Sequence, residues 1–545
     1  MDKLVTALAV GLLSIAAASP AATLIVTSAA DGGSGSLRSA VGHANDGDTI
    51  VFDPSLNGST LTLTRGEIAV KNSIDIEGPG PALLAVSGGD ATRIFNLAQA
   101  GIRVTIAGLT LTHGLGSGAQ GGGAILSSSA SLALSNAVLS YNRVLYAASG
   151  QWAEGGAISQ NDSASLVAAN TRFLFNAAVG GPGGFGAVGG AIASDKNSSL
   201  VLTGCLFQSN LARGGDGAIV TGDNYVRGGI SAGGAIMSGK GGTLEIASSV
   251  FDGNQSIGGS GGSVATLSSA APFYALGTSE GGAIDNHNDS VMTITASTFT
   301  HNLGQGGSNN TGGPSGFGFL GVALGGAINN QGTATITGSL FDDNSAVGGG
   351  GNGGAGQAFY GQGAGGAIFS WPNAGPGDMV AVDVTFSDNA AAGGAGNAPA
   401  PRLFSGEGMG GAIAVFLGAS TTLHGGSLVG NAATGGSGPG VGGAIANTTG
   451  STVLVDGSAL QSNTAGGGAG GWGGAVWNDG PSVVPFNAGV LTALSIRNAS
   501  ITGNTAATDG GGVYATPGGS GCASGSTISG NAPDNLGGQQ LQPCL

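Results

Sequence analysis

The strongest constraint on the fold is the tetrapeptide Gly-Gly-Ala-Ile, which recurs along the chain in step with a second motif. Intact copies begin at Gly122, Gly155, Gly189, Gly233, Gly281, Gly325, Gly365, Gly410 and Gly442, with degenerate copies at Gly473 and Gly511. After each copy come an apolar residue, two variable residues and an asparagine: Asn142, Asn176, Asn210, Asn254, Asn302, Asn344, Asn389, Asn431, Asn463, Asn504 and Asn531. Two motifs that keep step in this way indicate a repeat protein.

Each repeat contains three stretches typical of short strands. Gly-Gly-Ala-Ile predicts one, an alternating segment such as Leu244–Ile246 a second, and Phe-x-x-Asn a third. Three strands per coil predict an all-β parallel β-helix over residues 49–531. The glycines allow positive φ and close approach of coils. The phenylalanines should stack about 4.8 Å apart. The asparagines should form a structural ladder of stacked amides, in a left-handed turn conformation.

The two ends of the chain differ from the repeats. Residues 1–22 resemble a secretory signal, for which an N-terminal membrane anchor is the alternative, and no other apolar run of about 20 residues predicts a transmembrane span. Residues 23–48 predict a strand and a short helix, capped by Ser36 or Ser34, that covers the first coil. Residues 532–545 predict a C-terminal cap. Cys522 and Cys544 bracket the tail and are a candidate disulfide.

Charge and motif content exclude several classes of function. The net charge is −15 with 14 Lys plus Arg and no run of cations, which argues against a nucleic-acid partner. No Cys/His spacing predicts a zinc site. Calcium could bind an acidic surface, but glycine-rich stretches such as Gly258–Val264 lack the aspartate of the calcium-binding nonapeptide. We therefore predict no metal and no cofactor.

Insertions of variable length enter each repeat at one corner. Between each Asn and the next Gly-Gly-Ala lie 12, 12, 22, 26, 22, 20, 20, 10 and 9 residues. Insertions in a solenoid map to one face, often the binding face, here that of coils 191–412. The loops carry candidate binding aromatics, which would either stack on sugar rings or anchor the loops: Tyr225, Phe273, Tyr274, Phe317, Phe319, Phe359, Tyr360 and Phe404.

Two sets of side chains are candidates for catalysis. Asp343 and Asp388 share a register position in successive coils, so their carboxylates could lie within about 5 Å. A second set lies in one repeat, and in it a histidine near carboxylates could act as a general base or bind a metal: Glu280, Asp285, His287, Asp289 and His301. The simpler interpretation of both sets is ordinary turn residues.

Cations are scarce in the central coils, where only five occur: Lys196, Arg213, Arg227, Lys240 and Arg402. Enzymes that act on polyuronates need cations to hold the uronate groups. This scarcity therefore argues against such an enzyme.

The paired motifs resemble the repeats of polymorphic outer-membrane proteins over about residues 120–531. Gly35–Val41 is similar to the CSLREA motif of secreted bacterial β-helix proteins, with Gly35 in place of Cys and Ser39 in place of Glu. The resemblance implies a right-handed, pectate-lyase-like β-helix, secreted or associated with the outer membrane, with an adhesive role.

The sequence leaves three functions open. The first is an exported, non-enzymatic, adhesin-like protein that binds a glycan or a cell-surface ligand with its loop-bearing face. The second is a polysaccharide-active enzyme of the β-helix type, with its centre near residues 280–302. The third is a structural surface-layer component. A groove lined with carboxylates beside the loops would favour the enzyme over a binding protein.

Overall fold

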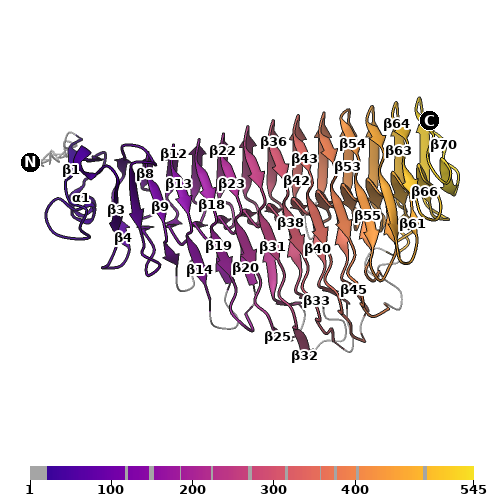
Figure 1. The fold of residues 1–545 in the computed structure, drawn as a ribbon, viewed down its shortest axis with the longest axis horizontal. Helices are drawn as coiled ribbons and strands as arrows, with labels where there is room; N and C mark the ends of the chain where they lie inside the picture. Colours follow the sequence, from indigo (N-terminus) through magenta and orange to yellow (C-terminus); the bar gives the residue numbers. More distant parts are fainter. Residues whose placement is uncertain are drawn as a thin grey trace, which may run out of the picture.

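The protein is a long stack of parallel strands (Figure 1). The computed structural model describes residues 21–116, 121–146, 152–184, 186–222, 225–267, 273–313, 317–355, 357–372, 377–399, 404–482 and 488–544. The predicted signal segment, residues 1–22, lies outside these ranges except for its last two residues.

Strands that are equivalent in successive coils pair in parallel to form continuous sheets. One sheet has 16 strands and two have 14, and two shorter sheets have 11 and 9. A single coil contains β15 (Trp152–Glu154), β16 (Ile158–Asn161), β17 (Ser165–Ala169), β18 (Arg172–Leu174) and β19 (Ala177–Val179). Each of these pairs with its equivalent one coil further on. The parallel β-helix is confirmed.

The coil contains more strands than the sequence predicts. Strands β16, β17 and β18 correspond to the three predicted strands, whereas β15 and β19 form the two shorter sheets. The equivalents of β15 and β19 in other coils are two to four residues rich in Ala and Gly, as in β46 (Gly363–Ala364) and β50 (Ala390–Ala392). Such short segments lack the apolar alternation that marks a strand in sequence.

Stacked phenylalanines fill the centre of the coils. The rings of Phe173, Phe207, Phe251, Phe299, Phe341 and Phe386 are buried, and successive centroids lie 4.5–5.1 Å apart. This spacing follows the rise from coil to coil, as predicted. Stacked aromatic pairs contribute about 0.5–1.5 kcal/mol each beyond their burial.

The asparagine ladder runs from Asn142 to Asn531, and its members are buried. Each side-chain amide donates to the Oδ1 atom of the next asparagine at 2.8–3.0 Å. The predicted left-handed conformation of these asparagines is wrong, because the residue just before each of them adopts it. Where that residue is not glycine its φ is 51–56°: Tyr141, Phe175, Ser209, His301, Asp343, Asp388 and Ser462.

The left-handed residue explains how the Phe and the Asn of the Phe-x-x-Asn motif both point into the coil. In the coil of Phe173, residues Leu174 and Phe175 both point outward before Asn176 is buried again. Strict alternation would have put Asn176 on the outside. One left-handed residue therefore interrupts the alternation at the corner and returns the asparagine to the interior.

The glycine pair closes each coil. In the copy at Gly281–Ile284, Gly281 has a φ of 66°. A Cβ on Gly282 would overlap the carbonyl oxygen of Gly326 in the next coil. One glycine thus supplies a left-handed turn and the other permits close contact between coils, as predicted.

A helix covers the N-terminal end of the rod, and strands continue to its C-terminal end. Helix α1 (Leu37–His43) has Ser36 as its N-cap, with the side chain accepting from the Ser39 N–H, and buries Leu37 and Val41. Strands β69 (Leu536–Gly538) and β70 (Gln542–Pro543) continue two of the main sheets. The β-helix therefore extends beyond residue 531, into the segment predicted as a separate cap.

The candidate disulfide is present, and the third cysteine is free. Cys522 and Cys544 form a disulfide beside the last strands, and Cys205 is a free, buried thiol. Among the described residues no helix has both the length and the apolar character that crossing a bilayer requires.

The insertions form ordered layers on one side of the rod, at the lower edge in Figure 1. Strands β26 (Tyr225–Gly228), β33 (Phe273–Leu276), β39 (Phe317–Leu320) and β45 (Gln357–Tyr360) pair in a four-stranded sheet. A second asparagine ladder, in which the Asn310 amide donates to Asn352 Oδ1 at 3.1 Å, runs through the same loops. The insertions thus repeat the stacking of the coils.

Candidate functional site

Four of the eight predicted binding aromatics lie inside the loops. Tyr274, Phe319, Phe359 and Tyr360 are buried, whereas Phe273, Phe317 and Phe404 are half-buried. The rings pack on one another, as Phe319 does on Phe359 with centroids 4.9 Å apart. The side chain of Tyr225 falls outside what the structure describes. The four buried rings anchor the loops, and a sugar platform built from them is excluded.

The predicted aspartate pair occupies turns. Asp343 and Asp388 are exposed and hold the left-handed position before their ladder asparagines. His301 lies in the same row of turns, with Nδ1 3.0 Å from Asp252 Oδ1 and Nε2 3.7 Å from Asp343 Oδ2. Neither aspartate lines the pocket described next, and His301 does not join Glu280 and His287 there.

A cavity of about 280 Å³ opens beside β15, β20 (Gly186–Val188), β27 (Ile230–Ala232) and β34 (Ser279–Glu280). Its size is just below the usual range of about 300–1,000 Å³ for small-molecule sites. It results from stacked register, because Glu154, Val188, Ala232 and Glu280 occupy one position in four successive coils. The small side chains in the middle leave space between the two glutamates.

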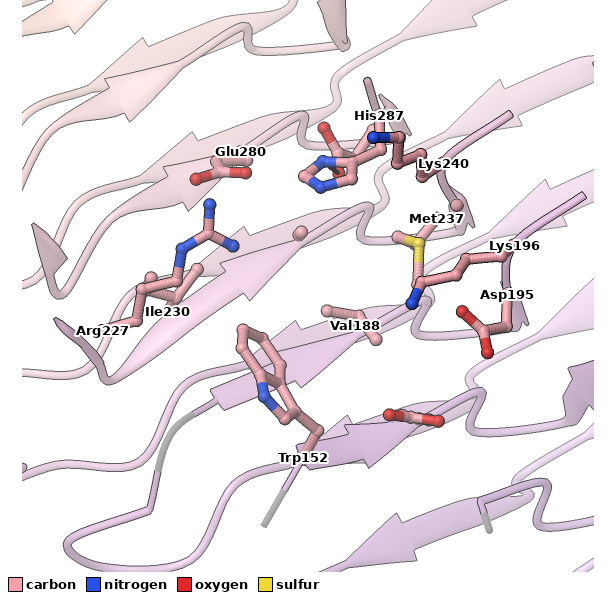
Figure 2. A pocket seen from close by; sticks show the side chains of 14 residues that line it. Trp152, Val188, Asp195, Lys196, Arg227, Ile230, Met237, Lys240, Glu280 and His287 are labelled. Atoms are coloured by element: carbon pink, nitrogen blue, oxygen red, sulfur yellow. Dashed lines mark ion pairs between the residues drawn. The ribbon is translucent and has the colours of Figure 1, made fainter. Parts of the chain in front are cut away.

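One wall of this pocket is apolar. Trp152, Val188, Ile230 and Met237 line it (Figure 2). Trp152 is in register with Gly186 in the next coil, and a Cβ on Gly186 would crowd the indole ring. The absent side chain at Gly186 thus makes room for the ring. An indole beside a cavity offers a flat apolar surface with a polar N–H.

Another part of the wall carries two carboxyl groups and a histidine, one coil beyond Met237, which is in register with Asp285. Glu280, Asp285 and His287 each place one potential ligand atom within 4.8 Å of the others. Gln331 Nε2 donates to Glu280 Oε2 at 3.3 Å, and Asn329 Nδ2 donates to Asp285 Oδ1 at 2.7 Å. Glu280 and Asp285 are buried, while the His287 side chain is 25% exposed with Nδ1 3.7 Å from Asp285 Oδ2.

Burial shifts the proton equilibria of this wall. It raises the pKa of Glu280, against the opposing charge of Arg227 and the Gln331 hydrogen bond. The pKa of Asp285 is raised well above its ordinary value by burial and by the neighbouring Glu280. The pKa of His287 is lowered to about 4, first by burial and then by the charge of Arg227. Near neutral pH the histidine is therefore uncharged.

A third carboxyl group lies near the tryptophan. Burial, and then the charge of Asp195, raises the pKa of Glu154 to about 7. By register Glu154 is three coils from Glu280, which corresponds to about 14 Å along the axis. It therefore lies toward the other end of the pocket from the Glu280–Asp285 pair.

The predicted catalytic set is thus only partly assembled. Glu280, Asp285 and His287 meet, Asp289 lies nearby in an ion pair with Lys240 at 3.4 Å, and His301 lies elsewhere. The set of two carboxylates and one imidazole is also one that could hold a divalent cation.

The pocket also contains residues that were not predicted, because they come from repeats other than that of Glu280: Trp152, Glu154 and Asp195. A signal was present for one of them. Glu154 and Glu280 each stand immediately before a Gly-Gly pair, so they share a register position.

Comparisons with known proteins give little beyond the fold. No family model matches the chain, and no curated protein matches it. One similar solved structure is described as the Agl-KA catalytic domain, with 13% identity, a TM-score of 0.29, and coverage of 93% of this chain and 63% of that one. Another is described as a mannuronic acid specific polysaccharide family 6 lyase from human gut microbiota, with 11% identity, a TM-score of 0.24, and coverage of 75% and 86%. Likenesses of this size assign no function.

Proposed function

We propose that the protein is a polysaccharide-active enzyme that hydrolyses glycosidic bonds in the Trp152–Glu280 pocket. The observation that carries the proposal is the pair of carboxyl groups, Glu280 and Asp285, held side by side on a buried wall of a pocket that an indole ring also lines. Glycoside hydrolysis uses two carboxyl groups that differ in protonation. The indole ring of Trp152, toward the other end of the pocket, would pack against the apolar face of a neighbouring sugar in the chain.

The environments of the two groups suggest their roles. Asp285 has its pKa raised by burial and by the Glu280 charge, so it is suited to donate a proton to the glycosidic oxygen as the C1–O bond breaks. Burial also raises the pKa of Glu280, but the Arg227 charge and the Gln331 hydrogen bond oppose that shift, so of the two groups Glu280 is the one suited to attack C1 as its anion.

The second half of the reaction reverses the proton transfer. Water then adds to C1, gives its proton to the Asp285 carboxylate and releases Glu280. A separation of about 5 Å between carboxyl groups is typical of retention of configuration, whereas inverting enzymes hold them about 6.5–9.5 Å apart. The atoms of Glu280 and Asp285 that approach one another lie within 4.8 Å, which favours retention.

The enzyme is favoured over an adhesin-like protein because of where the side chains lie. The loop aromatics that would form a binding surface are largely buried, whereas the carboxylates gather in a concave pocket. The predicted signal segment supports a reaction outside the cytoplasm.

The test is release of reducing ends from a panel of polysaccharides by the purified protein. We expect Glu280→Gln and Asp285→Asn to lower kcat/KM by a factor of about 10²–10⁴, as loss of an acid or base group does. Asp343→Asn is the matched control, because this carboxylate is exposed in a turn and does not line the pocket. The proposal is wrong if Asp343→Asn lowers turnover as much as the two pocket variants, or if the panel is bound but never cleaved. Binding without cleavage would instead favour the adhesin-like function.

A further inference from the structure

The pocket also gathers most of the cationic side chains of the central coils in an otherwise acidic protein. The formal net charge is −15, yet Lys196, Arg227 and Lys240, three of the five cations of the central coils, line this one cavity. Of the other two, Arg213 pairs with Asp216 at 2.9 Å, and Arg402 lies outside the described residues. The scarcity of cations that argued against an acidic substrate therefore does not apply where the substrate would bind.

The three cations occupy different depths. Arg227 is half-buried and lies beside Glu280, whose charge it opposes. The Lys196 and Lys240 side chains reach toward the cavity from the segments that follow β21 (Ile192–Ser194) and β28 (Ile236–Ser238) (Figure 2). Both lysines are exposed. They therefore lie where a bound sugar chain would enter.

The lysines are incompletely neutralised within the protein. Lys240 Nζ lies 3.4 Å from Asp289 Oδ2, with both side chains about half exposed, so that solvent weakens the pair. Lys196 forms no ion pair with any residue that the structure describes.

The carboxyl groups of the pocket do not cancel this charge fully. Four carboxyl groups line the pocket. Burial favours the neutral forms of Glu154 and Asp285, and Arg227 opposes the charge of Glu280. Asp195 is exposed, so solvent weakens its effect. The negative charges elsewhere on the rod are screened over a Debye length of about 8 Å at physiological salt. A ligand in the pocket would thus be governed by the two nearby ammonium groups rather than by the net charge of the protein.

We propose that the sugar chain bound in this pocket is acidic, and that Lys196 and Lys240 hold its carboxylate or sulfate groups. This inference rests on the proposed function for its site, and it names the class of substrate. Lysine ammonium groups act as mobile point charges, so they suit repeated acidic groups along a flexible chain. Lys196 and Lys240 are specificity-determining residues, and the bond cleavage stays with Glu280 and Asp285.

The test is calorimetric binding of three sets of oligosaccharides: uronate oligomers, the same oligomers with their carboxyl groups reduced to alcohols, and sulfated oligomers. Reduction keeps the sugar backbone and removes only the charge. We expect the acidic oligomers to bind at least about tenfold more tightly than the reduced ones, as a charge-assisted contact provides. Preference for the uronate or the sulfated set distinguishes the two sources of charge.

Substitutions test whether the two lysines cause the preference for acidic oligomers. The double variant Lys196→Gln/Lys240→Gln should remove the preference for the acidic oligomers and leave the affinity for the reduced ones unchanged. Lys71→Gln is the matched control, since Lys71 is exposed and does not line the pocket. Equal affinity for charged and reduced oligomers across the three sets overturns the inference, as does a preference that the double variant retains.

The two proposals fail in different ways. Lysine-dependent binding of acidic oligomers without release of reducing ends would support the acidic ligand and refute hydrolysis. Cleavage of neutral polysaccharides, with no preference for acidic oligomers, would support hydrolysis and refute the acidic ligand.

Discussion

Replacing Asn302 by alanine tests the asparagine ladder at its centre. The Asn302 amide donates to Phe251 O at 2.9 Å and to Asn344 Oδ1 at 2.8 Å, and its Oδ1 accepts from the backbone N–H of Asn254 at 3.0 Å and from the Asn254 amide at 2.9 Å. Alanine removes all four bonds inside a buried column. Asn344 Oδ1 keeps the Asn302 backbone N–H as a donor.

The magnitude follows from what is left unpaired. The Asn254 backbone N–H and one amide hydrogen of Asn254 lose their acceptor, and each such buried donor costs about 1–3 kcal/mol. We therefore expect the free energy of unfolding to fall by about 2–5 kcal/mol. Because a coil contacts only its neighbours, the loss of amide protection from hydrogen exchange should be confined to the coils around residue 302.

The assay is guanidinium unfolding followed by circular dichroism, with hydrogen exchange to locate the change. Asn57→Ala is the control, because Asn57 is exposed and its side chain makes no hydrogen bond with the residues that the structure describes. A change for Asn302→Ala below about 0.5 kcal/mol, or loss of protection spread evenly along the rod, would refute the reasoning.

Two further predictions concern a titrating group and a glycine. Folding raises the pKa of Glu154 to about 7 from an ordinary value of 4.5, so its contribution is present below pH 4.5 and is lost as pH rises through 7. Glu154→Gln should therefore be more stable than wild type at pH 8 by about 2 kcal/mol and equal at pH 4, and equal stability at both pH values would contradict this. Gly282→Ala should lower the thermal midpoint strongly, because its Cβ would overlap Gly326 O in the next coil, whereas Gly338→Ala, at an open position with a φ of 55°, should cost only about 1–2 kcal/mol. Similar midpoints for the two variants would show that the coils can move apart.

The sequence alone determined the architecture, because two motifs that recur in every repeat, with short strands between them, specify a parallel β-helix. Gly281 and Gly282 need to be glycine for reasons that act within one coil and its neighbour. Phe299 and Asn302 stack on identical residues in the neighbouring coils, so the same contacts recur from one repeat to the next. The sequence could not show which residue takes the left-handed turn, because residues as different as Tyr141 and Asp343 hold that position.

The site was recognisable only in part. Glu280, Asp285 and His287 lie within eight residues, and their proximity was expected from sequence. The pocket depends on register across four coils, which places Trp152 and Lys196 in one cavity with Glu280 although each is more than 80 residues away from it in sequence. Insertions of unequal length separate these residues, so sequence distance does not predict spatial distance. Tertiary stacking alone decided which aromatics were buried and where the cations gathered, because both depend on contacts between coils.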